Sequence, residues 1–284
     1  MKTVRTIAEV RDAVAAARAT GRTVGFVPTM GAFHDGHLSL MRRARERCGF
    51  VVVSLFVNPT QFNDAADLAA YPRDEAHDAT MARADGVDLL FTPDVRTLYP
   101  GAEATTVAVS GLSEVLEGES RGAGHFRGVT TVVAKLFNIV APDVAFFGQK
   151  DAQQALIVRR MTADLDFPVE IDVCPTVRES DGLAMSSRNG RLAADERVRA
   201  LALRHGLSVA EAAIAAGDRD AARIAASASA AMRERGVEPE YFALVSAATL
   251  QPVVPLAGRI LVAVAAPVGP VRLIDNVLVD VPAT

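Results

Sequence analysis

The sequence predicts an α/β protein in which an open parallel sheet is followed by a smaller α+β unit. The chain has 284 residues, about twice the length of a usual single domain. From residue 6 to residue 173, short β-branched and aromatic runs alternate with helical patterns, as in parallel sheets. After Val177 this alternation stops. We therefore expect a sheet domain over residues 1–177 and a smaller domain over residues 178–284, with a hinge near 177–189.

Apolar spacing identifies the helices and strands of the first domain in order. Ile7, Val10 and Val14 fall on one face of the first helix, which Gly21 ends. The expected helices are 6–20, 37–47, 74–84, 130–138 and 153–165, and the expected strands are 23–27, 50–57, 87–91, 144–147 and 169–173. Ligands of such sheets bind at the carboxyl ends of the strands, so polar residues that follow a strand are candidate site residues.

The C-terminal part has a different pattern of residues. A polar, Gly-containing segment is followed by two Ala-rich helical patterns and three strand-like runs. The expected helices are 195–216 and 219–236, and the expected strands are 241–246, 259–264 and 271–279. Pro267, Gly269 and Pro270 place a turn between the last two strands. This arrangement predicts a small α+β cap.

Composition excludes several classes of function. The formal charge is -4, and no Lys/Arg block supplies the basic surface that nucleic-acid binding needs. The N-terminus lacks the apolar core of a signal peptide, and the run 260–268 is far shorter than the roughly 20 residues that cross a bilayer. Cys48 and Cys174, far apart in apolar settings, fit two buried side chains in a reducing compartment. We expect a cytoplasmic protein with no nucleic-acid or membrane partner.

Lysine is scarce in this chain. Lys2, Lys135 and Lys150 are the only lysines among 30 basic residues, and all the others are arginines. A lysine kept against this background draws attention, because arginine replaces a compact ammonium poorly where the group must point at a phosphate.

The segment from Pro28 to His37 lies between a predicted strand and the helix that follows it. Gly31 and Gly36 allow close backbone approach, and a helix N-terminus attracts anions. His34 and His37 fall on the same side of the first turn, where both rings can donate to phosphate oxygens. From these two histidines alone, two other interpretations stay open: they could be a pair of metal ligands, or surface residues that lie together by coincidence.

Three further segments place polar side chains where they could meet a ligand. The segment 147–154 follows a strand and contains Lys150 and Gln154, although an exposed βα loop is an alternative. The segment 185–189, in the predicted hinge, could be a mobile clamp for a triphosphate or an ordinary serine-rich loop. Asn58 and Gln61 follow the second strand and would face the same edge as the histidines.

The segment 122–129 precedes the predicted helix that carries Lys135. It contains His125 and Arg127. Nothing in their spacing fixes a chemical role, so a structural or loop-ordering role is expected for both.

The HxGH pattern at residues 34–37 resembles the signature of the nucleotidyltransferase and class I synthetase superfamily. Together, five segments resemble one family, pantothenate synthetase (pantoate:β-alanine ligase), in the family's order and over essentially the whole chain. They read PTMGAFHDGH, FVNPTQF, GHFRGVTTVVAKLFN, FGQKDAQQ and MSSRN. In class I synthetases a KMSKS loop occupies the place in the chain that MSSRN has here.

This resemblance implies a Rossmann-like domain with a smaller C-terminal lid, a homodimer, and ATP- and Mg²⁺-dependent condensation of pantoate with β-alanine through pantoyl adenylate. It places His34 and His37 on the ATP phosphates and Lys150 on the transferring group, and it assigns pantoate to Gln61 and Gln154, with Asn58 beside them. The negative charge that develops on the phosphoryl oxygens during the reaction would also be stabilised by Ser186, Ser187 and Arg188. The implied nucleotide site contains Met30, Gly31, Gly36, His37, Gly148, Gln149, Lys150, Asp151, Val177, Met185, Ser186, Ser187 and Arg188.

The chain departs from the family pattern at a few positions. Phe33 stands where Leu is usual, and Gln149 where Glu is frequent. The stretch 74–78, linked with metal in some relatives, reads DEAHD here, so no protein ligand for Mg²⁺ is assigned and the phosphates would hold the ion. Two alternatives stay open: a nucleotidyltransferase acting on a phosphate ester, and a non-catalytic ATP-binding module.

Overall fold

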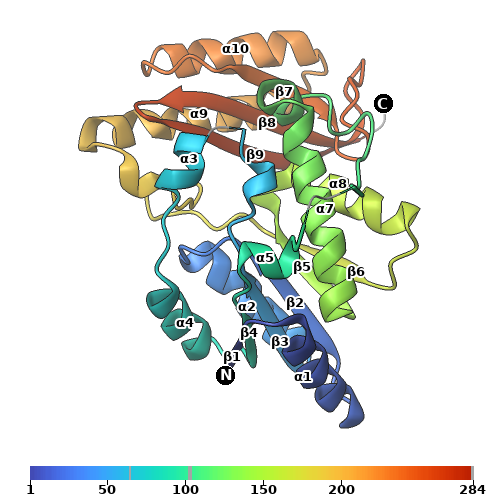
Figure 1. Ribbon diagram of the computed structural model, residues 1–284. Coiled ribbons are helices and arrows are strands. Elements are labelled where there is room, and N and C mark those ends of the chain that lie inside the picture. Colours follow the sequence, from blue (N-terminus) through green and yellow to red (C-terminus); the bar gives the residue numbers. More distant parts are fainter. Residues whose placement is uncertain (64, 102–103, 283–284) are drawn as a thin grey trace. The chain divides into compact units, whose positions relative to one another are not determined.

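The computed structural model describes residues 1–63, 65–101 and 104–282, which form two compact units. The N-terminal unit consists of residues 1–149 and 153–175, and the C-terminal unit of residues 150–152 and 176 onward (Figure 1). Lys150–Ala152 therefore group with the C-terminal unit, although the sequence on both sides of them belongs to the N-terminal one.

The N-terminal unit is built on a six-stranded sheet in which every pair is parallel. The strands are β1 (Lys2–Val4), β2 (Val24–Thr29), β3 (Phe50–Leu55), β4 (Leu89–Phe91), β5 (Val144–Gly148) and β6 (Glu170–Cys174), in the order β1-β4-β3-β2-β5-β6. The predicted fold class is confirmed. The chain runs outward from β2 toward β3 and β4 and then restarts on the other side with β5, so the topological switch point, where such sheets bind ligands, lies between β2 and β5.

Four strand predictions need correction. β3 ends at Leu55 rather than at residue 57, and β4 begins at Leu89 rather than at residue 87. β1 was not expected, because three residues at the edge of a sheet are too few to show a periodic pattern. β2 was expected to end before Pro28 but continues to Thr29 beside β3. The proline is tolerated because the pairing of β2 with β5 has already ended at Phe26, so no ladder bond on that side is lost.

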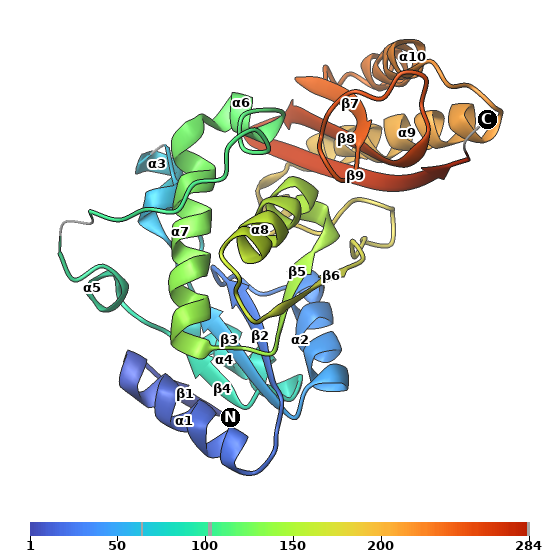
Figure 2. The ribbon, with the colours of Figure 1, turned by 90° about the vertical axis from the view of Figure 1, so that its right-hand side faces the viewer.

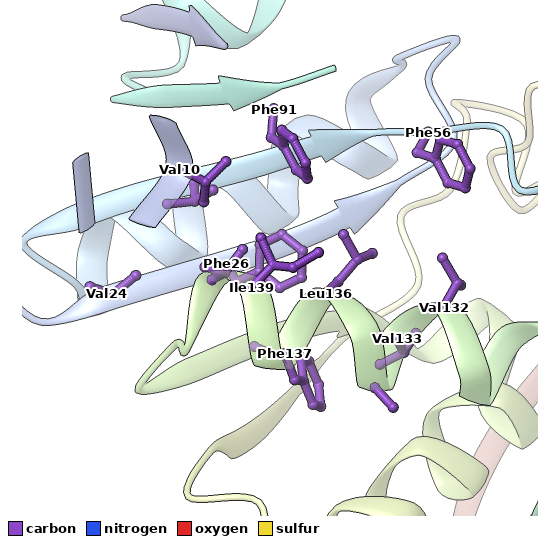
Figure 3. Close-up of a cluster of buried hydrophobic side chains, with 14 of the residues drawn as sticks. Val10, Val24, Phe26, Phe56, Phe91, Val132, Val133, Leu136, Phe137 and Ile139 are labelled. Carbon is purple, nitrogen blue, oxygen red and sulfur yellow. The ribbon is translucent and has the colours of Figure 1, made fainter. Parts of the chain in front are cut away.

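Helices cover both faces of this sheet. On one face lie α1 (Ile7–Ala19), α7 (Ala123–Val140) and α8 (Ala152–Asp164), and on the other lie α2 (Asp35–Arg47) and α4 (Glu75–Ala84). Figure 3 shows the first face, where Leu136 and Ile139 of α7 lie against Phe26 of β2 in one apolar cluster. Short elements connect these layers: η1 (Pro59–Gln61), α3 (Ala65–Ala70), α5 (Val95–Leu98), α6 (Glu117–Arg121) and η2 (Gln149–Asp151).

Helix α7 begins at Ala123 rather than at the predicted residue 130, so His125 and Arg127 are helical and not in a loop. Gly124 and Gly128 obscured this start, because glycine usually weakens a helix. At Gly128 the glycine is required by packing: a Cβ there would come within 2.4 Å of the Thr60 carbonyl oxygen. The helix crosses η1 at backbone distance, and no larger residue fits.

The C-terminal unit contains a three-stranded antiparallel sheet, β7 (Tyr241–Ser246), β8 (Gly258–Val268) and β9 (Val271–Val281), in sequence order. Helices α9 (Ala194–Ala215) and α10 (Ala221–Arg233) share one apolar cluster with it. Figure 2 shows both helices beside this sheet. The short η3 (Asn189–Arg191) precedes α9. The turn predicted around Gly269 is present, with Val268 paired to Val271, and β8 and β9 are longer than predicted.

The two cysteines are free and buried, as expected. Burial raises the pKa of the Cys48 thiol, and raises that of Cys174 to about 11, so both stay protonated and act as small apolar side chains. None of the helices in the described part of the chain is long and apolar enough to cross a membrane.

Candidate active site

The two histidines of the HxGH segment lie at the carboxyl end of β2. His34 is the N-cap of α2, and its Nδ1 accepts a hydrogen bond from the Gly36 amide at 3.1 Å. In a neutral ring this bond places the proton on Nε2, which makes Nε2 the donor atom of the side chain. The His37 ring lies beside it, with the centroids 4.2 Å apart. The prediction that both rings share one side of the first turn is confirmed.

The backbone before His34 has an unusual conformation. Gly31 and Ala32 both have positive φ, at 88° and 54°, a region that alanine rarely adopts. Asp78, a buried residue of α4, holds this bend: its Oδ2 accepts from the Ala32 amide at 2.9 Å and its Oδ1 from the Phe33 amide at 2.7 Å. The sequence singled out Asp78 only as part of a polar stretch, and no periodic signal ties it to a loop so far away in the chain.

Gln61 is held by a network around η1, next to the histidine segment. The buried Asn58 donates from Nδ2 to Gln61 Oε1 and to the Gly128 carbonyl oxygen, both at 3.1 Å. Gln61 Nε2 in turn donates to Met30 Sδ at 3.1 Å. The structure thus brings Met30, Asn58 and Gln61 together. Both amide hydrogens of Asn58 are used within the chain, so this residue orients Gln61.

Two aromatic residues support the same network. The Tyr99 hydroxyl donates to Asn58 Oδ1 at 2.9 Å, and Lys135 Nζ lies 5.0 Å from the centre of the Tyr99 ring. His125 Nδ1 lies 2.8 Å from the Gln61 carbonyl oxygen. The ordering role expected for His125 is therefore confirmed, whereas Arg127 is exposed on the same helix. Tyr99 was missed because its partner is a side chain from a distant loop.

Replacing Gly128 with alanine is expected to disturb Gln61 directly. The added Cβ would lie 2.4 Å from the Thr60 carbonyl oxygen and 2.8 Å from the Gln61 amide nitrogen, so η1 must shift. We expect a loss of about 1–3 kcal/mol in the free energy of unfolding, as for other overpacked sites, measured by urea denaturation. Gly124→Ala is the matched control, because on the same helix its Cβ meets only Asn63 Oδ1 at 3.7 Å. Equal midpoints for the two variants would contradict the close approach.

The second candidate segment follows β5 at the switch point. Gly148 ends β5, and Gln149–Asp151 form η2. Lys150 belongs to the C-terminal unit, where its carbonyl oxygen accepts from Asn276 Nδ2 at 2.9 Å and its Nζ lies 3.7 Å from Asp151 Oδ1. The Asn276 contact fixes the backbone of the rare lysine. Gln154 lies in the first turn of α8 and is half-buried.

The third candidate segment is an ordered turn in the C-terminal unit. The Met185 amide donates to the Val177 carbonyl oxygen at 3.0 Å, so these two predicted nucleotide contacts are adjacent. Ser186 Oγ accepts from the Arg188 amide at 3.2 Å. Asn189 is buried and ties the turn to Ala184, because its Nδ2 donates to that carbonyl oxygen at 3.1 Å. Ser187 and Arg188 are half-buried in the same turn.

The side chains of these segments do not form a metal centre by themselves. Within residues 1–63, 65–101 and 104–282, no three His, Cys, Asp or Glu side chains are arranged to hold an ion. A magnesium ion at this site would need the oxygens of a bound phosphate as its ligands.

The chain is similar to known proteins in sequence and in fold. The sequence model of the pantoate-beta-alanine ligase family matches residues 2–278. A pantothenate synthetase from Moorella thermoacetica is 53% identical over 285 residues, covering 99% of each chain. A crystal structure of pantothenate synthetase from Thermus thermophilus superposes with a TM-score of 0.89 at 44% identity, covering 98% of this chain and 99% of that one.

A third similar protein was crystallised with ligands. It is the pantoate-beta-alanine ligase from Francisella tularensis complexed with beta-gamma ATP and beta-alanine. Its TM-score is 0.76 at 32% identity, with 98% of this chain and 97% of that chain covered. On its sequence, its fold and its match to these relatives, the chain is an enzyme that belongs to the pantoate-beta-alanine ligase family.

Proposed function

We propose that this enzyme condenses pantoate with β-alanine at the expense of ATP, through a pantoyl-adenylate intermediate, releasing pyrophosphate and AMP. One observation carries the proposal: in a chain of this family, the His34 and His37 rings stand side by side at the end of β2, at the switch point of the sheet. The related ligase crystallised with an ATP compound and β-alanine supports both ligand classes.

The first step overcomes the low reactivity of a carboxylate toward amines. A pantoate carboxylate oxygen attacks the α-phosphorus of ATP, the bond to the β-phosphate oxygen breaks, and pyrophosphate leaves. Negative charge builds up on phosphoryl oxygens during this displacement, so donors aimed at those oxygens lower the barrier. The N-terminus of α2 and the Nε2 side of His34 are such donors.

We take the roles of the other candidate residues from the resemblance of their motifs to the family. His37 contacts the phosphates with His34, and Lys150 contacts the transferring group. Gln61 and Gln154 hold pantoate, with Asn58 acting through Gln61, whose amide it fixes. The remaining phosphate and nucleotide contacts are assigned to Met30, Gly31, Gly36, Gly148, Gln149, Asp151, Val177, Met185, Ser186, Ser187 and Arg188.

In the second step the β-alanine amine attacks the activated carbonyl carbon of pantoyl adenylate. An amide bond forms, the carbon–oxygen bond to AMP breaks, and AMP leaves with the amine proton passing to solvent or a base. Mg²⁺ enters as the counter-ion of the ATP substrate, since the described residues offer no metal cluster. We further assign residues 1–177 as the ATP and pantoate domain and residues 178–284 as a lid, in a cytoplasmic homodimer.

Isotope exchange between ATP and pyrophosphate tests this function. The enzyme is expected to exchange labelled pyrophosphate into ATP only when pantoate is present, and to release AMP when β-alanine is added. A nucleotidyltransferase acting on a phosphate ester would exchange with that ester and not with pantoate. A non-catalytic ATP-binding module would bind ATP without any exchange, and either result would refute the proposal.

A further inference from the structure

The carboxylate of Asp78 is hydrogen-bonded to the backbone of the histidine segment. Asp78 is 1% exposed and belongs to α4, more than forty residues after the segment in the chain. Its two oxygens accept from two consecutive amides, those of Ala32 and Phe33. A carboxylate with both oxygens bonded to the main chain restrains backbone geometry more tightly than a neutral acceptor, because its hydrogen bonds are charge-assisted.

The bend that Asp78 restrains includes a backbone conformation that is unfavourable for a residue other than glycine. Gly31 and Ala32 have successive positive φ values, and an L-alanine disfavours that region. Such a bend turns neighbouring N–H groups toward one side and makes a small anion-binding hollow. Here the hollow is filled by the protein's own carboxylate, and a Cβ on Gly31 would lie 2.9 Å from Asp78 Oδ2.

The restrained bend leads directly to both histidines. His34 is the next residue after Phe33 and caps α2, where its Nδ1 accepts from the Gly36 amide. The Phe33 side chain is buried, and its ring centroid lies 5.5 Å from that of His37. By holding the Phe33 amide, Asp78 therefore fixes two positions: that of the start of α2, and that of the Phe33 ring, which lies beside His37.

We propose that Asp78 is a positioning residue that presents His34 and His37 to the phosphates of ATP, an inference that rests on the proposed function. Its effect passes through the Ala32 and Phe33 amides and the Phe33 ring, without contact with substrate. The alternative is a metal ligand, which an acidic residue near a triphosphate suggests. The described residues do not support it, because among them no second and third ligand accompany Asp78.

The test compares Asp78→Asn with Asp74→Asn. Asp78→Asn keeps the shape of the side chain but sets an NH₂ group against one of the two backbone amides. Asp74→Asn makes the same change of charge next to the same helix, where Asp74 caps the His77 amide and asparagine caps equally well. Pantoate-dependent exchange, the KM for ATP and the Mg²⁺ concentration giving half-maximal exchange are measured for both and for the unaltered enzyme.

We expect Asp78→Asn to lower the maximal exchange rate about 10- to 100-fold, as misplacement by about 1 Å can do, with the KM for ATP changed less. Its half-maximal Mg²⁺ concentration should stay that of the unaltered enzyme, and Asp74→Asn should exchange normally. Unchanged exchange by Asp78→Asn would overturn the proposal, and so would recovery of its activity at high Mg²⁺, which marks a metal ligand.

Folding is checked by thermal unfolding. If Asp78→Asn does not fold, Asp78→Glu is measured instead, because it keeps the charge and moves the carboxylate by one methylene. We expect the same loss of exchange. Normal exchange by Asp78→Glu, or failure of both variants to fold, overturns the proposal. Absence of exchange in the unaltered enzyme contradicts the proposed function itself, whereas an active unaltered enzyme with an equally active Asp78→Asn contradicts only the role of Asp78.

Discussion

His37→Ala is expected to lower the rate of pantoate-dependent pyrophosphate exchange by about 10²- to 10³-fold, the usual cost of removing one preorganised donor to a developing negative charge. The ring lies in the first turn of α2 and beside His34, so its loss leaves the phosphates with fewer donors while the fold remains. Exchange kinetics at saturating ATP measure the effect, with circular dichroism to confirm folding.

The control for this prediction is His77→Ala. His77 is an exposed residue of α4 in the same unit, so its removal changes the histidine count without touching the site. It should exchange like the unaltered enzyme. Near-normal exchange by His37→Ala would remove His37 from the catalytic residues.

Arg178→Ala is expected to destabilise the C-terminal unit by about 3–5 kcal/mol, because it leaves a buried carboxylate without its partner. Arg178 binds Asp275 through both terminal nitrogens, at 2.6 and 3.0 Å, and the Asp275 side chain is 2% exposed. The loss should appear in hydrogen exchange of the full-length chain, as a lowered opening free energy for the amides of β8 and β9.

Arg233→Ala provides the comparison. Arg233 also forms a two-bond pair, with Glu238, but both side chains are exposed to water. Exposed pairs contribute little to stability, so protection of β8 and β9 should hardly change. Similar protection in both variants would show that burial of Asp275 does not matter.

The long elements of the fold could be predicted from the sequence because their apolar spacing repeats several times. The helix at Ile7–Ala19 and the strand at Tyr241–Ser246 lie at or within two residues of the expected positions. The start of α7 could not be predicted, since the reason for Gly128 is the backbone of η1, some seventy residues earlier in the chain. The spacing of apolar residues shows which face of a helix or strand is buried. It does not show which backbone segment packs against that helix or strand.

In the candidate site, too, some features could be predicted from the sequence and others could not. The placement of His34, His37 and Gln61 after strands could be predicted, because chain order alone puts them at one edge of the sheet. The supports of these residues could not. Asp78 and Tyr99 act through hydrogen bonds to distant partners, and such bonds leave no pattern in the sequence.

The central claim, that a carboxylate is activated on the α-phosphate of ATP, is tested most directly by isotope transfer. Pantoate labelled with ¹⁸O in both carboxylate oxygens is incubated with ATP, β-alanine and the enzyme, and the products are analysed by mass spectrometry. We predict one ¹⁸O atom in the phosphate of AMP and the other in the amide carbonyl of the product. Label in pyrophosphate or inorganic phosphate, or unlabelled AMP, would contradict it.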